Sequence, residues 1–335
     1  MPSEPAPDVL ALIDAINAHF PDVGGTVTDA AEARRILAAG PAWPFEPPRV
    51  GSVEDRAIPG PEGAPEIPVR IYRPEVEAEP SEAQPPTPRP TVVFYHGGGW
   101  VIGGLDTHDP IARALCRDAG AVVVSVDYRL APEARFPAAV DDAYAALCWA
   151  GGHVGELGGD PGALVAAGDS AGGNLAAVAA LIARDRGGPA LALQVLVYPA
   201  TDARPRVGTH GGGGAGHFLT PAHGRWFDEQ YFGPDGDRAH PHASPLLADL
   251  HGLPAAHIVT AGFDLLCEEG RAYAAKLNES GVSVTEGHYP GMFHGFFGFP
   301  ELLPDARAAQ QRVVEVIALT VSGRKKSGEG GGRTG

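Results

Sequence analysis

The sequence predicts an α/β protein with a mostly parallel sheet that helices cover on both faces. Two observations carry this prediction. Continuous apolar runs recur between residues 91 and 289, as expected for strands buried on both faces. Helical stretches lie between most of these runs. The predicted strands are TVVFYH (91–96), AVVVSVDY (121–128), ALVAAGDS (163–170), LALQVLVYP (191–199), AAHIVTAGFD (255–264) and VSVTEGHY (282–289).

The chain before residue 91 predicts two helices and then two strands. Apolar residues at helical spacing predict an amphipathic helix over residues 9–20, and a second helix is expected over about 29–39. Two short strands follow, near residues 50–58 and 67–72. Residues 74–90 are polar and rich in proline, which predicts an exposed loop.

The later connections complete the predicted alternation. Helices are expected over residues 109–119, 138–150 and 174–185. Residues 200–250 break the pattern with a glycine-rich stretch and then an aromatic group, which indicates an inserted helical segment. The tail from Ser322 is of low complexity, and we expect it to be disordered.

Composition argues against several classes of function. The chain has 25 Lys and Arg against 41 Asp and Glu, a formal charge of -16, which disfavours a nucleic-acid partner. No apolar run reaches the roughly 18 residues of a membrane span, and the N-terminus does not resemble a signal peptide. We therefore expect a cytoplasmic protein without stable membrane insertion. The cysteines Cys116, Cys148 and Cys267 match no zinc or disulfide pattern, so no metal site is expected.

Residues 168–172 fit the pattern Gly-x-Ser-x-Gly, with Ser170 at its centre. An apolar strand precedes them and a helical pattern follows, which is the context of a nucleophile elbow. The serine hydroxyl would stand above the sheet, next to a helix N-terminus that favours developing negative charge. We therefore predict that Ser170 is a nucleophile.

A second glycine-rich motif follows the strand at residues 91–96. His96-Gly97-Gly98-Gly99-Trp100 can present free backbone N–H groups to an oxyanion, a use known from lipases and esterases. His96 is interpreted as a structural residue that braces this loop. Another glycine run, at residues 211–214, follows no strand and is interpreted as a flexible loop.

A nucleophilic serine needs a base and an acid, which in this arrangement follow in the order serine, acid, histidine. His294 comes just after the last predicted strand, where Pro290 and Gly291 indicate a loop. Asp264 stands at the carboxyl end of the strand before it and could hold the imidazole tautomer. Asp202 follows another strand at a similar point and remains the alternative acid.

With these residues in place, the sequence resembles the hormone-sensitive lipase family of bacterial esterases, and most closely the subgroup with a GDSAGG elbow. The likeness extends over roughly residues 45–320. The motifs that carry it are HGGGW (96–100), DYRLAPE (127–133), FPAA (136–139), GDSAGGN (168–174) and YPGMFHGF (289–296).

The resemblance implies an α/β-hydrolase fold with an eight-stranded, mostly parallel sheet and a helical cap. It also implies that the N–H groups of Gly98, Gly99 and Ala171 form the oxyanion hole. Leu265 and Cys267 depart from the pattern that usually follows the acid in this family. The expected division is into N-terminal cap helices (1–45), a first core part (46–199), a cap insertion (200–235), a second core part (236–321) and a disordered tail (322–335).

The expected function is that of a serine carboxylesterase acting on short- to medium-chain esters without a cofactor. An amidase or lactonase with the same triad, or a non-catalytic receptor for a small ligand on this fold, are the alternatives. Trp100, Phe218 and Trp226 are expected either to line the substrate pocket or to form the core of the cap. Family members often pair through edge strands, so a homodimer is compatible with the resemblance.

Overall fold

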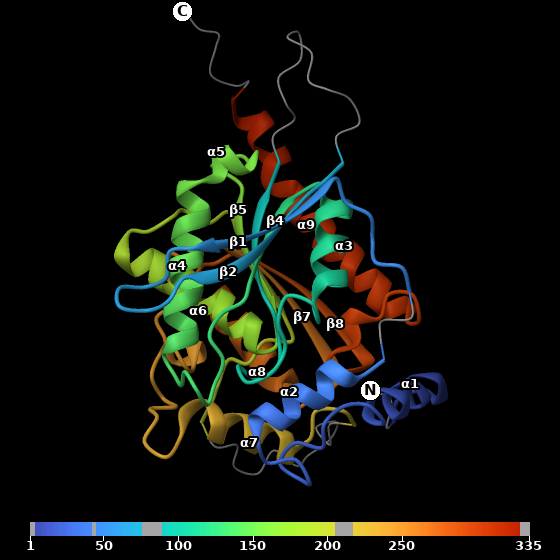
Figure 1. Cartoon of the computed structure of the whole chain (residues 1–335). Helices are drawn as coiled ribbons and strands as arrows, with labels where there is room; N and C mark the ends of the chain where they lie inside the picture. The colour runs from blue at the N-terminus through green and yellow to red at the C-terminus, as the bar shows by residue number, and fades with distance from the viewer. Residues whose placement is uncertain (1–3, 42–44, 76–88, 205–216, 329–335) are drawn as a thin grey trace, which may run out of the picture.

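The computed structural model describes residues 4–41, 45–75, 89–204 and 217–328, the last seven of these by their backbone alone (Figure 1). Three predictions fall wholly or largely outside these ranges. They concern most of the loop at 74–90, the glycine run at 211–214 and the end of the tail from residue 329.

The sheet has eight strands in the order β1-β2-β4-β3-β5-β6-β7-β8. The pairs β1–β2 and β2–β4 are antiparallel, and every other pair is parallel, as predicted. The strands are β1 (Ser52–Ile58), β2 (Ile67–Arg73), β3 (Thr91–Tyr95), β4 (Val122–Val126), β5 (Leu164–Asp169), β6 (Leu193–Val197), β7 (Ala255–Phe263) and β8 (Val284–Phe293).

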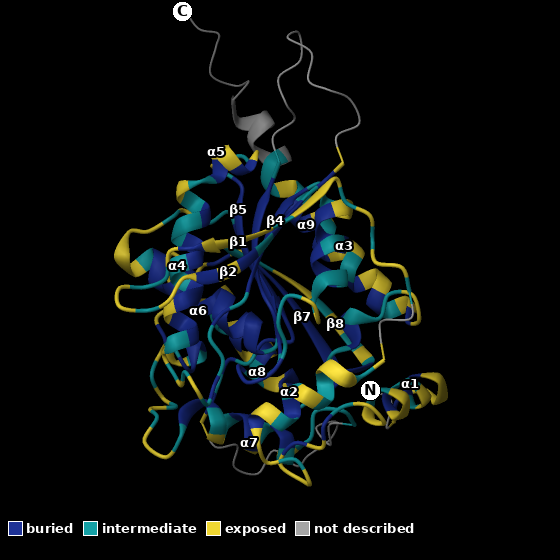
Figure 2. Ribbon diagram, viewed as in Figure 1, coloured by how far each residue is buried: buried dark blue, intermediate teal, exposed yellow. Residues whose placement is uncertain are grey.

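Helices cover both faces of the sheet, and each face has its own hydrophobic core. Along β3, Val93 and Tyr95 belong to one core, whereas Val92 and Phe94 belong to the other. This is the alternation that the pleat imposes on a strand buried on both sides. Figure 2 shows the central strands buried throughout. One face carries α4 (Ala138–Gly152), α5 (Val154–Leu157), α6 (Ala171–Arg186) and α8 (Cys267–Glu279), and the other carries α3 (Asp109–Ala119) and α9 (Pro304–Gly328).

Three further helices lie at the carboxyl end of the parallel strands, at the bottom of Figure 1. They are α1 (Pro7–Asn17), α2 (Ala30–Ala39) and α7 (Pro221–Phe232), and we call them the roof helices. Asp29 caps α2 by accepting a hydrogen bond from the Glu32 N–H, and Thr220 caps α7 in the same way. The short helices η1 (Pro245–Leu247) and η2 (Phe296–Gly298) complete the fold.

Several boundaries differ from the sequence prediction by a few residues, and two of these differences have a physical reason that can be named. Pro290 and Gly291 were predicted to lie in a loop but belong to β8, which runs to Phe293. A proline is tolerated there because β8 is an edge strand and its pairing with β7 is irregular between Tyr289 and Phe293. The tail was predicted to be disordered from Ser322, but α9 continues to Gly328, since a formed helix adds one hydrogen bond for each further residue.

Within the described ranges, no helix combines the length and the apolar character that crossing a membrane requires.

Candidate active site

Ser170 lies on the sharp turn between β5 and α6. Its backbone has φ 56 and ψ -118, a conformation that non-glycine residues rarely adopt. The flanking glycines are needed for space, because a Cβ on Gly172 would collide with the carbonyl oxygen of Tyr95, and one on Gly168 with that of Gly172. The Gly-x-Ser-x-Gly pattern therefore has a steric basis in this fold.

Three side chains from the ends of β5, β7 and β8 form one hydrogen-bonded chain. His294 Nε2 lies 2.9 Å from Ser170 Oγ, and His294 Nδ1 lies 2.8 Å from Asp264 Oδ2. A carboxylate only accepts hydrogen bonds, so Nδ1 carries the proton and Nε2 can accept the serine proton. The other oxygen of Asp264 accepts the Leu266 N–H at 2.9 Å. The structure thus brings together the three residues that the sequence predicted.

The alternative acid, Asp202, is placed differently. Its carboxylate pairs with Arg204 at 2.7 Å, while Asp264 contacts the imidazole. Tyr198 was missed by sequence reasoning and lies beside His294, with ring centroids 4.6 Å apart. Its backbone φ of 35 marks it as another residue held in an unusual conformation at the end of β6.

The glycine motif after β3 forms a tight loop. Gly98 has φ 117 and Gly99 has φ 58, and the N–H groups of Val101 and Ile102 both donate to Gly98 O. A Cβ on Gly98 would collide with Ile102 O, and one on Gly99 with the ring of Phe227. Side chains are therefore excluded at both positions.

The predicted oxyanion donors are available in this loop and at the start of α6. In the part of the chain that the structure describes, the N–H groups of Gly98, Gly99 and Ala171 donate no hydrogen bond. Unpaired N–H groups that face a cavity can stabilise a developing oxyanion.

Buried polar groups brace this loop from behind. The Gly97 N–H donates to Asp169 Oδ1 at 2.9 Å, and His108 Nε2 lies 3.3 Å from the same oxygen. Burial is the largest single influence and would raise the pKa of Asp169, but His108, joined by His96 and His294, lowers it, and the pKa lies below its ordinary value. His96 is fully buried and stacks on Tyr128, and burial lowers its pKa to about 3. His96 is therefore a neutral residue behind the loop.

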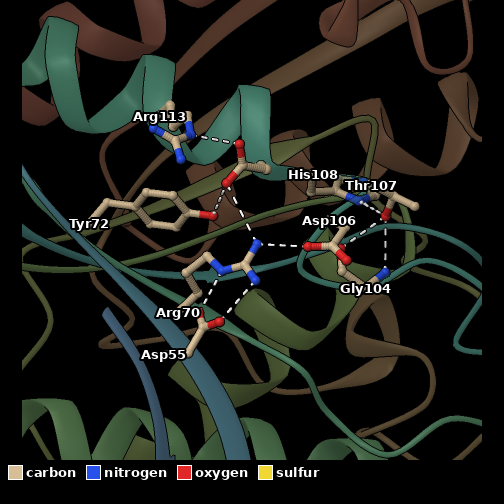
Figure 3. Close-up of polar contacts among 9 residues, drawn as sticks. Asp55, Arg70, Tyr72, Gly104, Asp106, Thr107, His108 and Arg113 are labelled. Atoms are coloured by element: carbon tan, nitrogen blue, oxygen red, sulfur yellow. Dashed lines mark hydrogen bonds and ion pairs between the residues drawn. The ribbon is translucent and has the colours of Figure 1, made fainter. Parts of the chain in front are cut away.

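A network around Arg70 fixes the segment 104–109 that carries His108 (Figure 3). The Arg70 guanidinium bonds to Asp55 at 2.6 Å and to Asp106 at 2.8 Å, and it lies 3.7 Å from Asp109. Asp109 also accepts a hydrogen bond from the Tyr72 hydroxyl at 2.8 Å. These contacts connect β1 and β2 to the segment that supports the glycine loop.

A mostly apolar cavity of about 320 Å³ lies above Ser170. Trp100 and Phe218 line it, which is one of the two alternatives that the sequence left open, and Trp100 also stacks on Tyr231 at 4.3 Å. Trp226 is not among the described residues that line the cavity. Its indole N–H donates to Thr28 O at 2.9 Å, so it belongs to the core of the roof. The neighbouring Phe227 lines the cavity instead and was missed, because the aromatic group alone does not tell which face of α7 points inward.

The site contains no metal-binding arrangement in the ranges described, where no three His, Cys, Asp or Glu side chains are placed to hold an ion. Cys267 is buried near Asp264, and burial raises the pKa of its thiol to about 11. Its thiol is therefore protonated and unreactive at neutral pH.

The fold and this site are those of an α/β hydrolase, and comparison with known proteins agrees. A family model described as alpha/beta hydrolase fold matches residues 92–298, and the chain belongs to this family. The GDSAGG subgroup remains a prediction.

Two curated relatives and one solved structure illustrate the likeness. The chain is 44% identical over 277 residues to the carboxylic ester hydrolase LipN of Mycobacterium tuberculosis, covering 81% of this chain and 71% of that protein. It is 41% identical over 315 residues to the carboxylesterase NlhH of the same species, covering 93% and 96%. The hyperthermophilic esterase from the archaeon Pyrobaculum calidifontis is 38% identical, with a TM-score of 0.82 over 95% of this chain and 99% of that one.

Proposed function

We propose that this protein is a serine carboxylesterase, in which Ser170 is the nucleophile, His294 the general base and Asp264 the residue that orients the imidazole. The observation that carries the proposal is the hydrogen-bonded chain from Asp264 through His294 to Ser170, with distances of 2.8 and 2.9 Å. The relatives named carboxylic ester hydrolase and carboxylesterase support the same reaction class.

In the first half of the reaction, Ser170 Oγ attacks the ester carbonyl carbon while His294 Nε2 takes the hydroxyl proton. The negative charge that develops on the carbonyl oxygen is stabilised by the N–H groups of Gly98, Gly99 and Ala171. The Asp264 carboxylate stabilises the imidazolium that forms. His294 then gives its proton to the leaving alcohol, and an acyl-enzyme remains on Ser170.

In the second half, water attacks the acyl-enzyme with His294 again as base, and the acid is released. Every proton moves through His294, so the residues described suffice for the reaction. The intact chain of three residues argues against a receptor that binds a ligand without turning it over.

The cavity favours short- to medium-chain esters. Its volume of about 320 Å³ lies at the lower end of the range for small-molecule sites, and its lining is mostly apolar. The expected homodimer, the cytoplasmic location and the absence of a nucleic-acid partner remain predictions.

The test is hydrolysis of p-nitrophenyl esters from acetate to palmitate by the wild type and by Ser170→Ala. We expect turnover of the shorter esters, a decline with chain length, and loss of about 10⁴-fold or more of kcat in the variant. No turnover by folded wild type across the series, or unchanged turnover by Ser170→Ala, would contradict the proposal.

A further inference from the structure

A second hollow, of about 730 Å³, lies on the face of the molecule where α3 and α9 pack side by side. Figure 1 shows these two helices next to each other, away from the roof helices. The reaction described above does not use this groove. Its lining includes Ala114 from α3 and Arg307, Gln311 and Val314 from α9, so it offers both apolar and polar surface.

The groove and the catalytic cavity share a wall. Pro110, Ile111 and Gly298 line both hollows. Leaving aside its chain neighbours, an added Cβ on Gly298 would meet only the Cδ1 atom of Ile111, at 4.0 Å, so there is room beside Gly298 for a larger side chain. Ile111 is thus the wall residue that faces Gly298.

The wall lies on the side of the cavity next to the catalytic imidazole. Gly298 ends η2, which begins two residues after His294, and Gly295 lines the cavity between them. In the proposed reaction the oxygen of the leaving alcohol must reach His294 Nε2 to be protonated. An alcohol chain whose ester oxygen lies at His294 Nε2 can therefore extend toward Ile111 and Gly298.

We propose that the groove between α3 and α9 is a subsite for the distal end of the substrate's alcohol chain, reached past Ile111 and Gly298. The inference rests on the proposed function and adds a substrate class to it. The preferred substrates are esters of an alcohol with an apolar chain next to the ester and a polar end.

The charges in the groove favour a neutral polar end, such as a hydroxyl or an ether. Arg117 pairs with Asp118, and Glu315 pairs with Arg312 at 2.9 Å. The Nε–H of Arg307 donates to Pro300 O at 3.2 Å. The lining also holds Glu301, so its charges are two arginines and three carboxylates, with neither sign in clear excess. A hydroxyl can donate to a carboxylate and accept from a guanidinium, so this mixed lining suits a neutral polar end better than an ion.

The experiment compares kcat/KM for ethyl butyrate and for 1,6-hexanediol monobutyrate, measured by titration of the butyric acid released. Gly298→Val fills the wall and should lower the ratio of hexanediol ester to ethyl ester by about 10-fold or more, the scale on which pockets discriminate single aliphatic groups. Ile111→Ala opens the wall and should raise the ratio. Gln311→Trp fills the groove without touching the cavity and should lower it.

Leu319→Trp is the matched control, because Leu319 is exposed on α9 and is not among the groove-lining residues. It should leave the ratio at the wild-type value, and thermal melts establish that each variant is folded. An unchanged ratio in both Gly298→Val and Gln311→Trp overturns the inference. The inference is also overturned if these two variants lose kcat/KM only toward ethyl esters of longer acids, because the groove would then bind the acyl chain.

Failure of the proposed function gives a different result. In that case folded wild type does not hydrolyse ethyl butyrate, or Ser170→Ala hydrolyses it as well as the wild type does. The ratio is read only when the wild type turns over ethyl butyrate and Ser170→Ala does not.

Discussion

The floor and the roof of the cavity are built in different ways. The floor consists of Ser170, Asp264 and His294, each at or just beyond the end of a strand in one sheet, joined by hydrogen bonds of 2.8 and 2.9 Å. The roof joins segments that lie some 200 residues apart in the chain. Its contacts include the bond from Trp226 to Thr28 and the edge-on packing of Phe20 against Phe218 at 4.9 Å.

Because the floor and the roof are built differently, the chemical step should depend on the floor, and stability and the choice of ester on the roof. The sheet fixes the floor, so changes there should act on the chemical step. Packing of aromatic side chains fixes the roof, so changes there should act on stability and on the choice of ester.

The largest effect is expected for Asp264→Asn. The amide can donate to His294 Nδ1 and so favours the wrong tautomer, which should lower kcat by about 10⁴-fold with little change in KM. Steady-state kinetics with p-nitrophenyl butyrate measures both. Asp202→Asn should lower kcat far less, because the Asp202 carboxylate pairs with Arg204 and not with the imidazole of His294. A larger loss in Asp202→Asn than in Asp264→Asn would reverse the assignment of the acid.

Gly99→Ala tests the point where the floor meets the roof. The new methyl group would collide with the ring of Phe227, and a φ of 58 is strained for alanine. The shifted loop should misplace an oxyanion donor and lower kcat by about 10²- to 10³-fold. Wild-type kcat in a folded Gly99→Ala protein would show that this loop does not stabilise the oxyanion.

The floor could be predicted from the sequence because its residues sit in short local patterns. Glycines around Ser170 are required by the close approach of Tyr95, so the steric demand leaves a readable motif. Asp264 was recognisable as the last residue of an apolar run. These signals depend on neighbours in the chain, and a single sequence contains them.

The features that the sequence did not predict depend on contacts between segments that are distant in the chain. Trp226 and Phe227 are adjacent and both aromatic, and only the packing of α7 against Thr28 and Gly99 decides which of them lines the cavity. Pro290 suggested a loop because proline is rare inside strands; it is tolerated in β8 because this strand lies at the edge of the sheet and pairs irregularly with β7 at this point. The residues around Pro290 do not reveal the order of the strands in the sheet.

Buried His96, behind the glycine loop, should make the stability of the fold sensitive to acid. Burial lowers its folded-state pKa to about 3 from an ordinary 6.5, so the unfolded chain takes up this proton first as the pH falls. The stabilisation is full above pH 6.5 and is lost progressively toward pH 3. The loss by pH 4 should be on the order of 3 kcal/mol.

Urea unfolding of the wild type and of His96→Asn between pH 7 and pH 4 measures this contribution. The variant should have a shallower decline in the free energy of unfolding, whatever its stability at pH 7. Equal slopes would mean that His96 binds its proton equally well in the folded and unfolded states.

The smallest effect is expected in the roof. Trp226→Phe keeps most of the aromatic packing but removes the hydrogen bond to Thr28, and should lower the free energy of unfolding by about 1 kcal/mol. Urea unfolding at pH 7 detects this change. A loss of kcat comparable to that of Gly99→Ala would contradict the separation between roof and floor.

The central claim, that Ser170 is the nucleophile, is tested most directly by reaction with diethyl p-nitrophenyl phosphate. Attack by Ser170 Oγ forms an O–P bond and expels p-nitrophenolate, which is counted by its absorbance while mass spectrometry locates the label. We predict one p-nitrophenolate per chain and a diethylphosphoryl group on Ser170, with neither in Ser170→Ala. A folded wild type that stays unlabelled, or a label that persists on another residue of Ser170→Ala, would contradict the account.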